Sequence, residues 1–234
     1  VTLDSCIIGN EITDFTGFTA PSSSNNNNRA SHGGAIAIYP NPGTEASLNI
    51  ISTIIGYNYS SYGGAVYIIG SGKTTHTVDT NSKNYGNTAF NDGGALYITG
   101  TESNVTLNGY IGYNTANNGS AVSIAGINGA TTFTSTSRVE KNNCIDPDPA
   151  DKAAVYFSPN ATTKTKLILK GLISGNTFVN NTTAYDVYVC NKNNSYFFSG
   201  NTFKITSSDG NPGIIRLGDN EINKKSKNSS FFYY

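Results

Sequence analysis

Carboxylates are the side chains of this 234-residue chain that could do chemistry, because a facing pair can hydrolyse a glycosidic bond and a cluster can bind calcium. Most aspartates are spread along the sequence: Asp4, Asp14, Asp79, Asp92, Asp151, Asp186, Asp209 and Asp219. Asp146 and Asp148 are close in sequence, which leaves a lone calcium site and a solvated loop as alternatives. The sequence therefore predicts no catalytic residue, no metal site and no cofactor.

The histidines and cysteines do not form a catalytic or metal-binding pattern either. His32 and His76 stand alone, and we expect both at the surface or at a corner of the fold. Cys6, Cys144 and Cys190 match no metal-ligand spacing and are interpreted as small core residues, with a disulfide between the last two left open.

Two short phrases recur along the chain and show how it is built. The phrase Gly-Gly-Ala-aliphatic begins at Gly33, Gly63 and Gly93, and again at Gly119 with Ser120 as its second residue. These starts are 30, 30 and 26 residues apart, which is typical of a repeat architecture. Looser copies occupy residues 153–157, 185–189 and 213–217. A second phrase, apolar-x-x-Asn, ends at Asn10, Asn58, Asn114, Asn142, Asn176 and Asn201, while Asn87 lacks its apolar partner.

The residues after each glycine pair alternate with period two, as in a strand. Two apolar columns result: Ile36, Val66, Leu96, Val122, Val155, Val187 and Ile215, then Ile38, Ile68, Ile98, Ile124, Phe157, Val189 and Leu217. If each repeat is one turn, both columns stack inside a continuous core. The sequence thus predicts an all-β fold: a right-handed, single-stranded parallel β-helix, or solenoid, of about seven coils with surface loop insertions. The repeated asparagines should form a side-chain ladder at one corner.

The domain organisation is a single β-helix over residues 1–234. We expect an Asn/Ser-rich loop insertion at 19–32, a Pro/Asp loop insertion at 143–152, and a tail at 221–234 that caps the last coil or links to another domain. Because the sequence begins at Val1, contains no Met and has no charged-then-apolar leader, we expect a mature or excised part of a longer product.

Charge and hydropathy exclude two classes of partner. The formal net charge is zero and 13% of residues are charged, so there is no basic stripe for nucleic acid. No apolar run reaches the roughly 18 residues of a membrane-spanning helix, so this segment is not expected to span a membrane.

The paired phrases resemble the repeats of the chlamydial polymorphic outer membrane proteins (Pmp) and of adhesin-like surface proteins. Gly33–Ile36, Gly63–Val66 and Gly93–Leu96 match the glycine phrase in full, and Phe198–Asn201 matches the aromatic-x-x-Asn phrase. The resemblance implies a β-helical surface passenger with adhesive roles. It also implies an extracellular or cell-surface location, outer-membrane-associated if the chain belongs to an autotransporter-like precursor.

The residue between the two apolar columns is expected to face outward. Tyr67, Tyr97, Tyr156 and Tyr188 occupy that position in four repeats and form the candidate ligand or partner face. The alternative is that these rings stack between coils and only stabilise neighbouring strands.

Eight Asn-x-Ser/Thr sequons are possible glycosylation sites, although such triplets also arise by chance in a chain this rich in Asn and Thr. They are Asn58, Asn104, Asn118, Asn160, Asn180, Asn181, Asn193 and Asn228.

Three functions follow from these observations. The leading one is a non-catalytic, adhesin-like or structural module that acts through an extended surface on host or cell-surface glycans or proteins. The second is a structural subunit of an extracellular filament or coat, in which copies of the chain stack end to end. The third is a polysaccharide-active enzyme. It is disfavoured because Asp92 and Asp186, the carboxylates nearest the repeated phrase, should lie three coils or roughly 14 Å apart.

Overall fold

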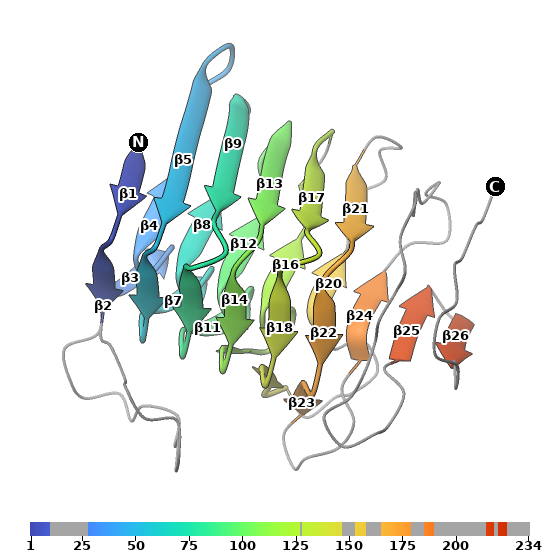
Figure 1. Cartoon of the computed structure of the whole chain (residues 1–234). Coiled ribbons are helices and arrows are strands. Elements are labelled where there is room, and N and C mark those ends of the chain that lie inside the picture. Colours follow the sequence, from blue (N-terminus) through green and yellow to red (C-terminus); the bar gives the residue numbers. More distant parts are fainter. Residues whose placement is uncertain are drawn as a thin grey trace.

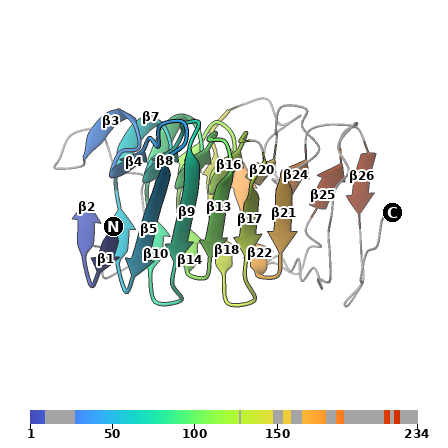
Figure 2. The ribbon, with the colours of Figure 1, turned by 90° about the horizontal axis from the view of Figure 1, so that it is seen from above.

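A computed structural model describes residues 1–9, 28–126, 128–146, 153–157, 165–178, 185–189, 214–217 and 220–223. Every element in these ranges is a β-strand, and the strands form four sheets in which successive coils pair in parallel (Figure 1). The predicted all-β parallel solenoid is therefore confirmed. Figure 2 shows the same coils from above, with strands of equivalent position stacked beside one another.

Sheets A and B each hold six strands, one from each successive coil. Sheet A consists of β1 (Thr2–Asp4), β5 (Glu45–Ile51), β9 (Lys73–Val78), β13 (Ser103–Leu107), β17 (Ala130–Phe133) and β21 (Lys166–Leu169). Sheet B consists of β2 (Ile7–Gly9), β6 (Ile54–Gly56), β10 (Lys83–Tyr85), β14 (Tyr110–Gly112), β18 (Arg138–Glu140) and β22 (Leu172–Ser174).

Sheets C and D complete each coil. Sheet C consists of β3 (Arg29–His32), β7 (Tyr59–Tyr62), β11 (Thr88–Asp92), β15 (Thr115–Ala116), β19 (Asn143–Cys144) and β23 (Thr177–Phe178). Sheet D has eight strands, namely β4 (Ile36–Ile38), β8 (Val66–Ile68), β12 (Leu96–Ile98), β16 (Val122–Ile124), β20 (Ala153–Phe157), β24 (Tyr185–Val189), β25 (Ile214–Leu217) and β26 (Asn220–Asn223).

The number of turns is smaller than predicted. The solenoid has about five turns rather than seven. The seven copies of the glycine phrase do form seven parallel strands, but all of them belong to sheet D, while the other sheets have six strands each. The number of copies of the phrase therefore gives the number of parallel strands in sheet D and not the number of complete turns.

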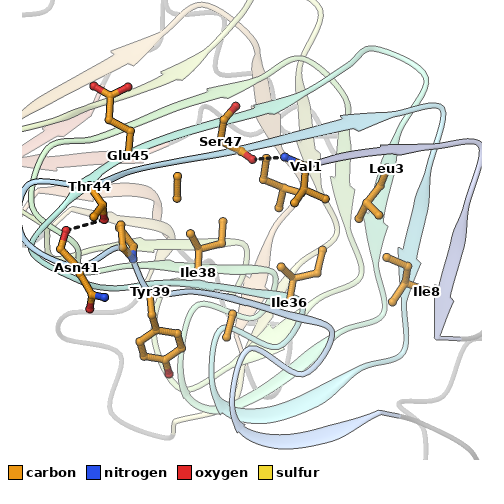
Figure 3. Close-up of a pocket in the computed structure, with 14 residues that line it drawn as sticks. Val1, Leu3, Ile8, Ile36, Ile38, Tyr39, Asn41, Thr44, Glu45 and Ser47 are labelled. Carbon is orange, nitrogen blue, oxygen red and sulfur yellow. Dashed lines mark hydrogen bonds between the residues drawn. The ribbon is translucent and has the colours of Figure 1, made fainter.

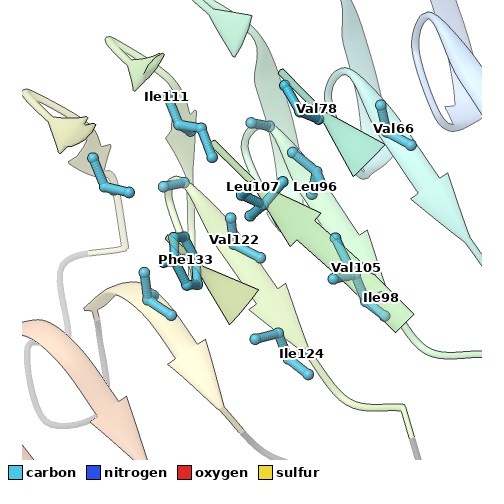
Figure 4. Packing of buried hydrophobic residues seen from close by; sticks show 14 of the residues in the cluster. Val66, Val78, Leu96, Ile98, Val105, Leu107, Ile111, Val122, Ile124 and Phe133 are labelled. Atoms are coloured by element: carbon cyan, nitrogen blue, oxygen red, sulfur yellow. The ribbon is translucent and has the colours of Figure 1, made fainter. Parts of the chain in front are cut away.

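The two predicted apolar columns are confirmed by the register of sheet D. Val66 pairs with Ile36 on one side and Leu96 on the other, and the pairing continues through Val122, Val155 and Val187 to Ile215. Leu96, Val122, Ile98 and Ile124 are almost completely buried against Val105, Leu107 and Phe133 of sheet A (Figure 4). Because each buried aliphatic side chain contributes about 1.5–3 kcal/mol, these columns are the main source of stability.

The predicted asparagine ladder is also confirmed, at the corner between sheets B and C. Asn58, Asn87, Asn114 and Asn142 each donate through Nδ2 to the Oδ1 atom of the asparagine one coil later, at 2.9–3.0 Å. The same Oδ1 atoms accept the backbone N–H of the preceding asparagine at 3.0 Å. The ladder therefore has a direction, because each coil donates to the next one.

The two ends of the ladder were not predicted. Asn28 donates to Asn58 at the start, and Asn176 donates to the carboxylate of Asp186 at the end, both at 2.9 Å. Asn10 and Asn201, the outermost asparagines of the predicted phrase, lie outside the described residues.

The corner before the ladder explains how the first coil accommodates an insertion. In the second coil Tyr57 alone joins Gly56 to Asn58, with a left-handed φ of 58°. Gly9 pairs with Gly56 and Arg29 pairs with Tyr59, although 19 residues of sequence separate Gly9 from Arg29 and only two separate Gly56 from Tyr59. The coil thus keeps its register on both sides of the insertion.

The predicted loop boundaries need correction at one end each. The Asn/Ser-rich loop was expected to reach residue 32, but Arg29–His32 forms β3. The Pro/Asp loop was expected to begin at 143, but Asn143–Cys144 forms β19. In both cases the strand pairs with its neighbours in sheet C, which local composition does not indicate. In the tail, β26 pairs antiparallel with β25, and residues 224–234 lie outside the described part of the chain.

His76 does not lie at the surface or a corner, so that expectation was wrong. It is 1% exposed and faces the core from β9, in register between Leu48 and Val105. Asn84 is also 1% exposed and occupies the apolar position of the Asn phrase, between Ile55 and Ile111. The third coil therefore buries two polar side chains, each between apolar residues of the coils before and after it.

A glycine in the left-handed region precedes β4, β8, β12 and β16 of sheet D, where it is required for a tight corner. Gly63 has a φ of 63°, and a Cβ atom there would lie 2.3 Å from the carbonyl oxygen of Val66. Gly43 has a similar φ of 74°, but its Cβ would meet nothing within 4 Å. Substitution of Gly43 would test the left-handed backbone conformation alone, whereas substitution of Gly63 would add a steric clash.

We expect Gly63→Ala to lower the free energy of unfolding by about 2 kcal/mol more than Gly43→Ala, because only the first substitution overpacks the corner. Gly43→Ala should cost about 1 kcal/mol, the usual penalty of the left-handed region. Urea denaturation of both variants measures the difference, and equal losses would show that the corner relaxes around a methyl group.

Candidate binding surfaces

The four predicted tyrosines lie in one register column of sheet D, as expected. Tyr67 pairs with Tyr97, and Tyr156 pairs with Tyr188, while Ser123 lies between the two pairs. The ring planes of the first pair are 20° apart with centroids at 5.5 Å, and those of the second pair are 3° apart at the same distance. The column is thus two separate stacks rather than one continuous face.

The first stack belongs to a larger group of five rings, the aromatic cluster, formed by His32, Tyr39, Tyr62, Tyr67 and Tyr97. His32 stacks on Tyr62 at 5.7 Å and contacts Tyr67 at 4.7 Å, Tyr39 lies 6.0 Å from Tyr67, and Tyr62 lies 5.3 Å from Tyr97. Rings at these distances attract one another beyond simple burial. The cluster therefore ties strands of sheets C and D together across three coils.

Exposure corrects the expectation that all four tyrosines are available to a ligand. Tyr67 and Tyr188 are each 5% exposed, and Tyr97 and Tyr156 are half-buried. Stacking within each pair covers one face of each of its two rings. Packing between coils, the alternative interpretation, accounts for most of the surface of these rings.

The buried hydroxyls of the cluster remain protonated at neutral pH. Burial raises the pKa of Tyr97 to about 12, and the nearby carboxylate of Asp92 adds to this increase. Burial also raises the pKa of Tyr67, and Tyr39 adds to it. Each hydroxyl can therefore act as a neutral hydrogen-bond donor and acceptor.

The predicted glycosylation sites differ in their exposure to solvent. Asn104 is exposed on β13 and open to modification. Asn58 is 1% exposed and held in the ladder, and Asn118 is 8% exposed with its side-chain oxygen bonded to the N–H of Gly119. In the folded chain these two side chains are therefore not accessible to modification. Five sequons lie outside the described residues: Asn160, Asn180, Asn181, Asn193 and Asn228.

A surface that sequence reasoning missed is the outer side of sheet A. Strands β5, β9, β13 and β17 lie side by side there (Figure 1). Each strand has two small side chains on its exposed side. We call this surface the flat polar face; its residues are Ser47, Asn49, Thr75, Thr77, Asn104, Thr106, Ala130 and Thr132. All eight are exposed or half-buried.

The flat polar face is ordered in both directions. Asn49, Thr77, Thr106 and Thr132 form one register column, and the other four residues form a parallel column two positions earlier. Coils repeat about every 4.8 Å, so hydroxyl and amide groups recur at that spacing. In β9 the exposed Thr75 and Thr77 alternate with the buried Thr74 and His76. Because the buried residues are also polar, this alternation could not be recognised in the sequence.

Charged groups near this face lie at its rim. Lys73 and Glu45, at the starts of β9 and β5, form an ion pair of 2.9 Å. The hydrogen bond to Glu45 and its negative charge raise the pKa of Lys73. The middle of the face therefore offers uncharged donors and acceptors.

The ranges that the structure covers contain no group of three or more His, Cys, Asp or Glu side chains placed to hold a metal ion. In the same ranges there is no helix with the length and apolar character needed to cross a membrane. No family model matches the chain, and comparisons with curated proteins and with solved structures likewise found no match.

Proposed function

We propose that the chain is a non-catalytic, adhesin-like β-helical module of an extracellular or cell-surface protein, and that it binds through an extended surface. The flat polar face is the observation that supports this proposal best. It presents two columns of small side chains, polar except for Ala130, over four strands. Such a surface suits a ligand that is itself extended and repetitive.

The chemistry of the face favours neutral glycans over charged polymers. Threonine, serine and asparagine side chains donate and accept hydrogen bonds in the way that sugar hydroxyls require. The threonine methyl groups add a thin apolar layer against which a sugar ring can lie. Many weak contacts along one chain of sugars give useful affinity through their number.

The proposal is tested by placing bulk and charge on the face. The wild-type chain and a Thr77→Lys/Thr106→Lys variant, whose substitutions are neighbours in register, are applied to an array of immobilised glycans. We expect the variant to bind its glycans at least about tenfold more weakly, a loss of roughly 1.4 kcal/mol, with an unchanged far-UV spectrum.

A matched control uses a register pair on another sheet. Thr88 and Thr115 are paired neighbours on sheet C and are equally half-buried, so Thr88→Lys/Thr115→Lys adds the same charge elsewhere. Equal losses in both variants would indicate a general charge effect. Retention of no glycan by the wild-type chain would reject glycans as the ligand.

A further inference from the structure

We infer that the outer side of sheet B binds an anionic polysaccharide, one that carries a sulfate or carboxylate group about once per disaccharide. We call the surface concerned the cationic tyrosine patch; its residues are Lys83, Tyr110, Tyr113, Arg138, Glu140 and Lys141. The patch belongs to a different sheet from the flat polar face, so the inference goes beyond the binding of neutral glycans and does not depend on it.

The register of three strands of sheet B assembles the patch. Lys83 of β10 pairs with Tyr110 of β14, and Tyr110 pairs with Arg138 of β18. The residue that follows each of them is buried, so these three side chains lie on the outer side of the sheet. Lys83 and Arg138 are exposed, and Tyr110 is half-buried between them.

A glycine makes room for the central aromatic ring. A Cβ atom at Gly112 would collide with the ring and the hydroxyl group of Tyr110, so the ring lies over this glycine, close to the sheet. The ring offers apolar area and a hydroxyl group, and both suit a sugar unit that lies between the two cations.

Tyr113 positions the third cation of the patch. Lys141 donates to the Tyr113 hydroxyl at 2.9 Å, and its Nζ atom lies 5.2 Å from the centroid of the ring. The hydrogen bond raises the pKa of Lys141, so the ammonium group stays charged. Because an ammonium group has three N–H donors, two of them remain for a ligand.

The positive charge of the patch is more exposed than its negative charge. Its carboxylate, Glu140, accepts from Nε and Nη2 of Arg138 at 2.9 and 2.7 Å. The Glu140 side chain is 16% exposed, whereas that of Arg138 is 59% exposed. Asp79, which comes four residues before Lys83, is held at the neighbouring corner by hydrogen bonds from backbone amides. The patch therefore presents cations to an anionic ligand.

The spacing of the cations indicates the repeat of the ligand. Lys83 and Arg138 lie two coils apart, which is about 9.6 Å at a coil spacing of about 4.8 Å. One disaccharide of an extended polysaccharide has a similar length, so successive anionic groups can contact both cations. The phosphates of a nucleic acid strand recur about every 3.4 Å, and most of them would contact no cation. The spacing therefore favours a polysaccharide.

The hollow at the first coil has the opposite character. Its volume is about 600 Å³, and Leu3, Ile8, Ile36 and Ile38 line it in Figure 3. The charged side chain among its lining residues is Glu45. Apolar walls and a carboxylate disfavour an anion, so this hollow is not an alternative site for the same ligand.

The experiment compares two lysines in matched positions. Lys83 and Lys73 are the exposed first residues of β10 and β9, and each Lys→Gln substitution removes one positive charge. A fluorescent chondroitin sulfate octasaccharide is titrated with the full chain at low salt, and anisotropy measures binding. We expect Lys83→Gln to weaken binding about fivefold, whereas Lys73→Gln should change it by less than about twofold. The double variant Lys83→Gln/Lys141→Gln should lose at least about twentyfold, because the two contacts are separate.

A single-stranded DNA of matched charge serves as the competing anion, and a neutral dextran octasaccharide serves as the uncharged control. The inference is overturned if the wild-type chain does not bind chondroitin sulfate, or if Lys83→Gln and Lys73→Gln weaken binding equally. It is also overturned if the DNA or the dextran binds as tightly as the sulfated sugar. Unchanged far-UV spectra show that the variants fold. Because the neutral glycan array tests the flat polar face alone, failure of either proposal leaves the other standing.

Discussion

Replacing Asn114 with alanine should lower the free energy of unfolding by about 4 kcal/mol, because several buried polar groups lose partners that cost about 1–3 kcal/mol each to leave unpaired. The Asn114 side chain accepts from the N–H and Nδ2 groups of Asn87 and donates to the Asn84 carbonyl and to Asn142, all at 3.0 Å. Water cannot replace these bonds readily, because Asn114 is 0% exposed. Urea denaturation followed by circular dichroism measures the loss.

The matched control for this substitution is Asn104→Ala, which lies on the exposed side of β13. An exposed asparagine of this kind should cost no more than about 0.5 kcal/mol. A similar small loss at Asn114 would mean that the ladder bonds are replaced locally and contribute little net stability.

Acidification should destabilise the chain through His76. Burial lowers the pKa of this imidazole to about 4 from its ordinary 6.5, although the hydrogen bond to the Leu48 carbonyl opposes the shift. The unfolded chain therefore binds a proton between these values that the folded chain does not. Stability from this group is complete above pH 6.5 and is lost as the pH falls toward 4, by roughly 3 kcal/mol in total.

A His76→Leu variant isolates this effect from the titration of carboxylates. Leucine matches the neighbours Leu48 and Val105 of the same column and removes Nε2, which has no hydrogen-bond partner among the described residues. Between pH 7.5 and 4, the difference in unfolding free energy between the variant and the wild-type chain should grow by about 2–3 kcal/mol. Parallel curves would show that His76 is protonated without unfolding.

The repeated phrases predicted sheet D and the ladder well because both depend on short-range patterns. Gly63 to Ile68 contains its own corner and its own inward and outward positions, and each copy repeats them. Strand β9 was not predicted, because its inward residues Thr74 and His76 are polar and the sequence therefore did not indicate a buried side. Alternation of polarity is informative only where the inward residues are apolar.

The candidate surfaces show a different limit. Sequence placed Tyr67 and Tyr97 in one column, but their exposure depends on His32, Tyr39 and Tyr62, which come from other strands. The flat polar face likewise exists only because four separate strands align Thr77 with Asn49, Thr106 and Thr132. Such surfaces arise from register between coils, which no single stretch of sequence contains.

The insertion at the first corner has a consequence for how chains of this kind can diversify. The sequence from Gly9 to Arg29 is 17 residues longer than that from Gly56 to Tyr59, yet β2 and β3 keep the pairing that β6 and β7 require. Closing a longer loop costs only about 0.6 kcal/mol per doubling of its length. The scaffold can therefore gain, lose or exchange whole segments at this corner during evolution, while selection on the columns and the ladder continues undisturbed.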